Sequence, residues 1–292
     1  MTSTKSFGDI EGVTYFPGNE KSNKPVCIMG SIHGNERIGA AVLERLKNEL
    51  SSLEIEPKSD IYLVIGNPEA YRRNVRFVDT DMNRLFSVDR DIHQPGNNIE
   101  EKRAREIAPV LTESYYLLDL HSTIKPSVPF VYCEPDSDHL ELANLMGVKY
   151  IVSTIANFRP ADLITSADNF VDRNGGFGIT FESGWHQDPL AIDSVLFLAK
   201  LFLQKTGACD FGLCEPKKLL ESKKLIIYNH VVPDSSSFTF AVDFDNFSMI
   251  SKGDIIGNDG GIEVRAERDS FVIFPKKYIQ NGKVACYLAH VS

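Results

Sequence analysis

The chain has 292 residues, of which 42% are hydrophobic and 24% charged, and its formal net charge is −9 at pH 7. A chain of this length can bury a large apolar core, in one large domain or in a large and a small one. The negative charge argues against a general binder of nucleic acids or anionic membranes, because phosphate groups attract basic surfaces.

Cysteine usage and apolar runs indicate the compartment. The 5 cysteines are odd in number and scattered, which is typical of reduced thiols and not of a disulfide framework. The first residues contain no apolar segment suited to a signal peptide, and no stretch of about 18 apolar residues could span a bilayer. We therefore expect a cytoplasmic protein without a membrane partner.

Up to about residue 207, short apolar runs alternate with longer amphipathic segments. This pattern is typical of an α/β domain, in which helices pack on a mostly parallel sheet. We expect strands at 25–30, 60–66, 115–121, 129–133, 149–153 and 177–182, and helices at 36–50, 98–113, 137–146 and 189–205. The polar stretch 67–97 shows little periodicity, and a loop of that length inside a domain is usually functional.

After Gly207 the pattern changes to short β-like runs separated by glycine-containing turns. We expect an α/β domain over residues 1–207 and a small all-β domain over 216–292, placed to shape the entrance of an active site.

Two histidines and a glutamate stand where predicted strands end. His33 and Glu36 lie between the apolar run 25–30 and a predicted helix, and His121 ends the run 115–121. A single histidine is usually a core imidazole bonded to a backbone carbonyl, but three such side chains at one edge of a sheet favour a metal site. Two imidazoles and a carboxylate are the ligands of a catalytic zinc, one per chain.

Two further residues stand near these ligands in the sequence. Asp119 lies on the same face of its strand as His121, where it would either orient that ligand or accept backbone hydrogen bonds. His186 follows Glu182 by four residues and is the only other histidine that we consider for the site.

The stretch 67–97 concentrates basic and amide side chains, with aspartates between them. Such a run is most often a solvated surface. In an acidic protein, however, arginine forks held by aspartates suit the binding of a carboxylate. The residues of interest are Arg73, Asn74, Arg76, Asp79, Asp81, Asn83 and Arg84.

In order and spacing, the whole set resembles the succinylglutamate desuccinylase and aspartoacylase family, within the zinc carboxypeptidase superfamily. The resemblance rests on His33-x-x-Glu36, Arg76-x-x-Asp79-x-Asp81-x-Asn83-Arg84, Asp119-x-His121 and Glu182-Ser183-Gly184. It implies a mixed sheet flanked by helices, with a smaller C-terminal all-β domain.

The resemblance also implies a role for each matching residue. His33, Glu36 and His121 would bind zinc. Glu182 would be the general base that works on the zinc-activated water, and its alternative is a surface or capping acid. Arg76 would polarise the scissile carbonyl, and Asn83 with Arg84 would hold the α-carboxylate of the substrate.

The chain departs from the aspartoacylase pattern where that branch binds the side-chain carboxylate of its substrate. Asp168 and Asp172 stand near those positions, Arg173 is one place out of register, and Tyr278 is the nearest match to a tyrosine of the family's β domain. We expect from these aspartates a modest preference for neutral or basic amino acids.

The sequence thus predicts a zinc-dependent amidohydrolase acting on a small N-acyl amino acid. One alternative is a carboxypeptidase or peptidoglycan-peptide hydrolase with the same catalytic set, which a β domain that caps the cleft would exclude. Another is a non-catalytic metal-binding or ligand-binding protein that has kept the fold. The acyl group, the amino acid, the physiological metal and the presence of a homo-oligomer stay open.

Overall fold

The structure, a computed structural model, describes residues 7–20, 23–52, 56–87, 96–155, 157–158, 160, 163–188, 190–214, 221–276, 279 and 282–292. The first strands are β1 (Val13–Phe16), β2 (Val26–Gly30), β3 (Ile61–Ile65), β4 (Tyr116–Thr123), β5 (Phe130–Tyr132), β6 (Tyr150–Thr154) and β7 (Phe177–Trp185). The helices are α1 (Arg37–Ser52), α2 (Pro68–Arg73), α3 (Ile99–Glu113), α4 (Ser137–Leu145), α5 (Ala167–Arg173) and α6 (Ala191–Lys205), with short 3-10 turns η1 (Phe7–Asp9) and η2 (Met82–Arg84). The later strands are β8 (Lys223–Val231), β9 (Thr239–Phe240), β10 (Ser248–Ile250), β11 (Ile255–Asp259), β12 (Ile262–Arg265), β13 (Ser270–Ile273) and β14 (Cys286–Val291).

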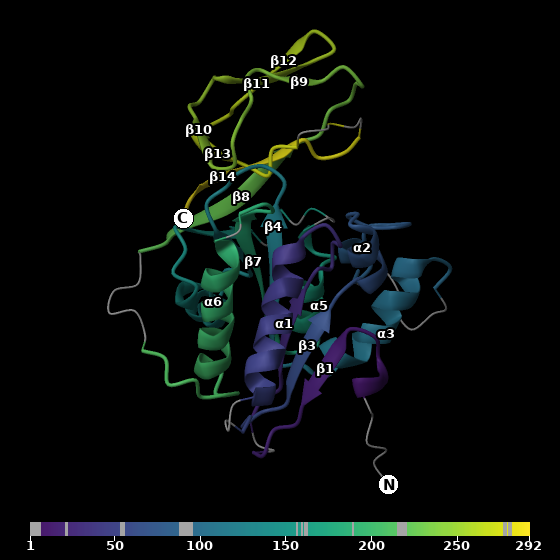
Figure 1. The fold of residues 1–292 in the computed structure, drawn as a ribbon. Helices are drawn as coiled ribbons and strands as arrows, with labels where there is room; N and C mark the ends of the chain where they lie inside the picture. The colour runs from purple at the N-terminus through teal and green to yellow at the C-terminus, as the bar shows by residue number, and fades with distance from the viewer. Residues whose placement is uncertain are drawn as a thin grey trace.

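Most of the strands form one mixed sheet of eleven, in the order β1-β3-β2-β4-β7-β5-β6-β8-β14-β13-β10. Strands β3, β2, β4 and β7 run parallel to one another, so their carboxyl ends meet at one edge. Three short strands, β12-β11-β9, form a separate sheet at the top of Figure 1.

Strand β2 shows why the centre of the sheet is apolar on both faces. Val26 and Ile28 belong to a core cluster that includes residues of α1, α4 and α6. Cys27 and Met29 point the other way, into a cluster with residues of α3 and α5. Because successive side chains of a strand alternate, a continuous apolar run such as this one requires helices on both faces of the sheet. Figure 1 shows α1 and α6 side by side over one of these faces.

The expected strands and helices of the first 207 residues are all present, and the expected fold class is confirmed. Three elements were not expected there, namely β1, α2 and α5. The stretch 67–97 is also more ordered than a loop in its described part, since it contains α2 and η2. Asn67 explains the start of α2, because its side chain accepts a hydrogen bond from the Ala70 amide, and Pro68 occupies the first helical position.

The C-terminal strands continue the main sheet. Strand β8 pairs in parallel with β6, and β14, β13 and β10 follow in antiparallel order. The division into domains at 207 and 216 stays a prediction, but hydrogen bonds of one sheet cross it. None of the helices that the structure describes combines the length and apolar character needed to span a bilayer.

Candidate active site

His33, Glu36 and His121 meet at the carboxyl edge of the sheet. The Nδ1 atom of His33 lies 2.8 Å from Glu36 Oε1, and Nδ1 of His121 lies 3.0 Å from Glu36 Oε2. All three side chains are buried, and one ligand atom from each lies within 4.8 Å of the others. The described residues thus contain a convergent set of two imidazoles and a carboxylate, the donor set of a catalytic zinc.

The turn between β2 and α1 brings the first two ligands together. Gly34 presses against the backbone of α2, where a Cβ atom would lie 2.0 Å from the Ala70 carbonyl carbon, so only glycine fits. The Ser31 hydroxyl donates to the Glu36 carbonyl at 2.8 Å, and the Gly34 amide donates to the Arg76 carbonyl at 3.1 Å. The first bond lies within the turn, and the second ties the turn to the polar loop that follows α2.

The outer nitrogen of each imidazole contacts an aspartate. Nε2 of His33 lies 3.0 Å from Asp81 Oδ1, and Nε2 of His121 lies 2.9 Å from Asp119 Oδ2. Such contacts fix the ring orientation and leave both Nδ1 atoms facing Glu36, where a metal could bind. The structure therefore decides between the two roles considered for Asp119, and it adds Asp81 as a partner that the sequence did not assign to His33.

The charges of this cluster support one another. Burial opposes ionisation of Glu36, but the two histidines outweigh it and hold its pKa well below the ordinary range. Burial likewise disfavours the charged form of His121, yet Asp119 and Glu36 raise its pKa well above the usual value. A divalent cation would replace a proton on His121, so metal binding there is coupled to proton release.

Glu182 lies across from His121, as its register partner on β7. It is 9% exposed, and burial raises its pKa to about 7. Its Oε2 atom has no hydrogen-bond partner among the described residues. A buried carboxyl with a pKa near neutrality and an oxygen available in a cavity is typical of a general acid or base.

The loop after α2 places Arg76 beside the ligands. Its Nη2 atom donates to Asp81 Oδ2 at 3.0 Å, and Nη1 lies 3.6 Å from Glu36 Oε1. The wholly buried carboxylate of Glu100 accepts the amides of Val78, Asp79 and Thr80 and so holds the loop backbone. Sequence reasoning missed Glu100, because an acid in the first turn of a helix is common without any such contact.

Asn83 and Arg84 are fixed in the turn η2. The Asp81 side chain caps this turn by accepting the Asn83 amide at 3.1 Å. The Asn83 side chain accepts the Ala167 amide at 3.1 Å, and Arg84 Nη1 donates to the Asn83 carbonyl at 2.9 Å. Aspartates therefore do hold this loop, as the sequence indicated.

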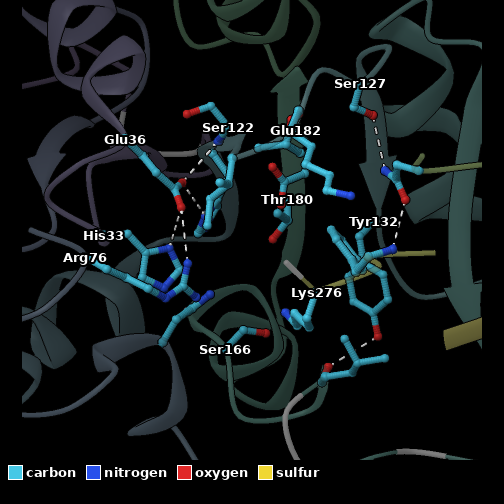
Figure 2. Close-up of a pocket in the computed structure, with 18 of the residues that line it drawn as sticks. His33, Glu36, Arg76, Ser122, Ser127, Tyr132, Ser166, Thr180, Glu182 and Lys276 are labelled. Atoms are coloured by element: carbon cyan, nitrogen blue, oxygen red, sulfur yellow. Dashed lines mark hydrogen bonds and ion pairs between the residues drawn. The ribbon is translucent and has the colours of Figure 1, made fainter. Parts of the chain in front are cut away.

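One cavity of about 190 Å³ is lined by the three candidate ligands and by Arg76, Asn83, Arg84 and Glu182. Figure 2 shows His33, Glu36 and Arg76 on one side, Glu182 along β7, and Lys276 on the other side near Tyr132. The C-terminal part of the chain contributes to the lining with Asn246, Phe274, Pro275, Lys276 and Tyr287. Sequence reasoning named none of these five, because no motif marks them.

The expected side-chain clamp is not formed by Arg173. Its guanidinium donates to the carbonyls of Ile164, at 3.0 Å, and Phe86, and the residue does not line the cavity. Asp168 and Asp172 do not line it either. The expected preference for neutral or basic amino acids therefore loses its basis. Tyr278 lies outside the described residues.

His186 is not part of the candidate metal site. Its Nδ1 atom is 2.7 Å from the Ser122 hydroxyl, so it contacts the residue that follows His121 and none of the three candidate ligands. Burial lowers its pKa, which keeps the ring neutral near pH 7.

Comparison with known proteins agrees with this site. Residues 22–201 match the model of the succinylglutamate desuccinylase/aspartoacylase catalytic domain. The chain is 27% identical to a succinylglutamate desuccinylase of Pseudomonas syringae pv. tomato, over 91% of this chain and 83% of that protein. A shorter match, 40% identical over 36% of this chain and 37% of the relative, is to a probable aspartoacylase of Acaryochloris marina.

Solved structures agree as to the fold. A succinylglutamate desuccinylase structure from Vibrio cholerae superposes with a TM-score of 0.79 at 18% identity, covering 96% of this chain and 85% of that one. The buried triad of His33, Glu36 and His121 is consistent with the zinc site typical of the matched family. Since the family model covers well over half of the residues, the chain belongs to the succinylglutamate desuccinylase/aspartoacylase family.

Proposed function

We propose that this chain is a zinc-dependent amidohydrolase that cleaves the amide bond of a small N-acyl amino acid with a free α-carboxylate. The observation that carries the proposal is Glu182, a buried carboxyl with an oxygen that has no hydrogen-bond partner among the described residues. It is the register partner of the candidate ligand His121 on the adjacent strand. A protein that only binds a metal has no need of such a group.

Zinc held by His33, Glu36 and His121 would supply a Lewis acid and a water of lowered pKa. Ionised Glu182 takes the proton of the attacking water and later passes it to the leaving amine. The guanidinium of Arg76 faces the charge that develops on the carbonyl oxygen, where a fixed cation stabilises the tetrahedral state. Asn83 and Arg84 bind the α-carboxylate, which sets the position of the amide bond.

The lining favours a small substrate over a long peptide. Asn246, Phe274 and Lys276 come from the C-terminal part of the chain and line the same cavity as the catalytic residues. This arrangement is the one that disfavours a carboxypeptidase or a hydrolase of peptidoglycan peptides, because those substrates need an open cleft.

The charge of the lining favours an acidic substrate. Arg76, Arg84, Lys125 and Lys276 surround the cavity in a chain whose net charge is −9. We propose that the ammonium groups of Lys125 and Lys276 face a second carboxylate of the substrate, because a substrate that fills the cavity removes water from these cations and a further anion offsets that cost.

The test is a panel of N-acetyl and N-succinyl amino acids, assayed with zinc and after its removal by a chelator. We expect zinc-dependent release of the free amino acid, with a higher kcat/KM for N-acetylglutamate than for the neutral isostere N-acetylglutamine. In addition, His121→Ala should lower the zinc content of the purified protein. Equal zinc in this variant and the wild type would contradict the ligand assignment, and absence of turnover on the whole panel would contradict the proposed reaction.

A further inference from the structure

The strands that carry His121 and Glu182 are joined irregularly just beyond these two residues. His121 is the partner of Glu182, but the next pair is Thr123 with Trp185, so β7 contains one residue more than β4. Gly184 has a φ of +92° there, and a Cβ atom on it would lie 2.7 Å from the Ser127 carbonyl oxygen. A β-bulge of this kind redirects side chains and interrupts the ladder that would otherwise hold the two strands in register.

Three hydrogen bonds near the bulge connect β4 to β7 and to the turn that follows β7. The Ser122 hydroxyl and His186 Nδ1 lie 2.7 Å apart, and the His186 amide donates to the Thr123 carbonyl at 3.0 Å. The Ser183 hydroxyl donates to the His121 carbonyl at 2.9 Å. Side chains of β7 and of the turn after it therefore hold the end of β4 at the point where the backbone pairing is irregular.

The contact between Ser122 and His186 also reaches the metal ligands. The Ser122 amide donates to Glu36 Oε2 at 3.1 Å, and this oxygen also lies 3.0 Å from His121 Nδ1. Ser122 thus binds Glu36 through its backbone and His186 through its side chain (Figure 2 shows the bond from Ser122 to Glu36). A displacement of Ser122 would therefore shift Glu36 Oε2, the oxygen that also contacts His121.

We propose that His186 is a positioning residue for the metal centre: through the Ser122 hydroxyl it fixes the Ser122 amide on Glu36 and sets the spacing between His121 and Glu182. Its effect on zinc affinity follows from the contacts alone, and its effect on turnover rests on the proposed function. Groups outside the ligand set that orient metal ligands typically change metal affinity or activity by about 10- to 100-fold when they are removed.

The sharpest experiment compares two amides at position 186. Asparagine carries a polar atom on Cγ, as histidine carries Nδ1, so His186→Asn keeps a partner for the Ser122 hydroxyl. Glutamine carries its amide one carbon farther out, so His186→Gln does not. Ser122→Ala removes the other half of the same bond and leaves the backbone amide in place. His290→Gln, on β14 and outside the cavity lining, controls for the loss of a histidine as such.

The measurement is the dissociation constant for zinc, by competition with a chromophoric chelator, alongside kcat and thermal unfolding of the zinc-free protein. We expect His186→Gln and Ser122→Ala to weaken zinc binding by about 10-fold or more, and their double variant to be no weaker than either alone. His186→Asn and His290→Gln should bind zinc within about 2-fold of the wild type.

Equal weakening in the asparagine and glutamine variants would overturn the proposal, as would unchanged zinc affinity in both His186→Gln and Ser122→Ala. A lowered unfolding temperature with unchanged zinc affinity would show a merely structural contact and would overturn it too. If the affinity pattern holds but the wild type cleaves no N-acyl amino acid, the proposed function fails and the positioning role stands.

Discussion

Two stretches of this chain have similar sequences but different positions relative to the cavity. Residues 76–84 and 166–173 are both short and polar, and each mixes arginine, aspartate and asparagine. The first lines the cavity, through Arg76, Asn83 and Arg84. In the second, Ser166 lines the cavity, but the rest forms α5, whose charged side chains contact other parts of the fold and not the cavity.

The scaffold contacts of α5 are specific. Asp168 is wholly buried, and Asp172 Oδ1 accepts the Gly178 amide at 2.7 Å and lies 3.0 Å from His139 Nε2. Arg173 donates to backbone carbonyls. The comparison teaches that charge composition does not identify a binding segment. A binding segment is identified by its position at the carboxyl ends of the parallel strands, where a loop can reach the cavity.

The largest expected effect is on the base. Glu182→Gln should keep the fold and the zinc but lose about 10²- to 10⁴-fold in kcat, because an amide cannot accept the proton. Since the pKa of Glu182 is raised to about 7, kcat/KM of the wild type should fall as the pH drops through about 7 and the carboxylate is protonated. Asp168→Asn, the matched change in α5, should stay active. Turnover above about a tenth of the wild type in Glu182→Gln would remove this residue as the base.

Next in size is the loss of Arg76. Arg76→Ala should lower kcat by about 10²- to 10³-fold with a smaller change in KM, because the guanidinium meets charge that develops only in the transition state. Steady-state kinetics on one substrate of the panel checks this. A change confined to KM would mean that Arg76 binds the ground state.

A smaller effect separates Arg84 from Arg173. Arg84→Ala should raise KM by about 10- to 100-fold with little change in kcat, since the α-carboxylate is charged throughout the reaction and a charge-assisted hydrogen bond is lost. Arg173→Ala should leave KM close to the wild-type value. A large rise of KM in the second variant, specific to acidic substrates, would restore Arg173 as the side-chain clamp.

The smallest effect on activity is expected in α5, where the change is one of stability. Burial and the charge of Asp172 raise the pKa of Asp168 from 3.8 to about 7. The folded state therefore holds a proton that the unfolded state releases, so stability falls as the pH rises from about 4 to about 7. Asp168→Asn should be more stable than the wild type at pH 8, by up to about 4 kcal/mol, and similar at pH 4.

Urea unfolding at both pH values tests this expectation. Asp172→Asn is the matched control and should destabilise, because it removes a charged partner of His139. Equal effects of Asp168→Asn at the two pH values would show that the Asp168 carboxyl does not titrate in this range.

The sequence by itself predicted the ligand set, the parallel strands that carry it and the family. The physical reason is that these signals are local: an apolar run buried on both faces predicts a central strand, and a polar residue just after it must lie at the sheet edge. The place of Glu182 at the end of a predicted strand is a signal of the same kind, but its role as the base came from the resemblance to the family. The composition of the loop predicted that aspartates would hold its arginines.

Only the tertiary structure decided which distant groups share the cavity. The contacts of Glu100 with the loop and of His186 with Ser122 join segments far apart in the chain, and so does the presence of Lys276 in the lining of the catalytic cavity. It also decided that the charged side chains of α5 do not line the cavity. Such outcomes depend on the packing of helices and strands against one another, and the composition of a segment does not encode which neighbour will cover it.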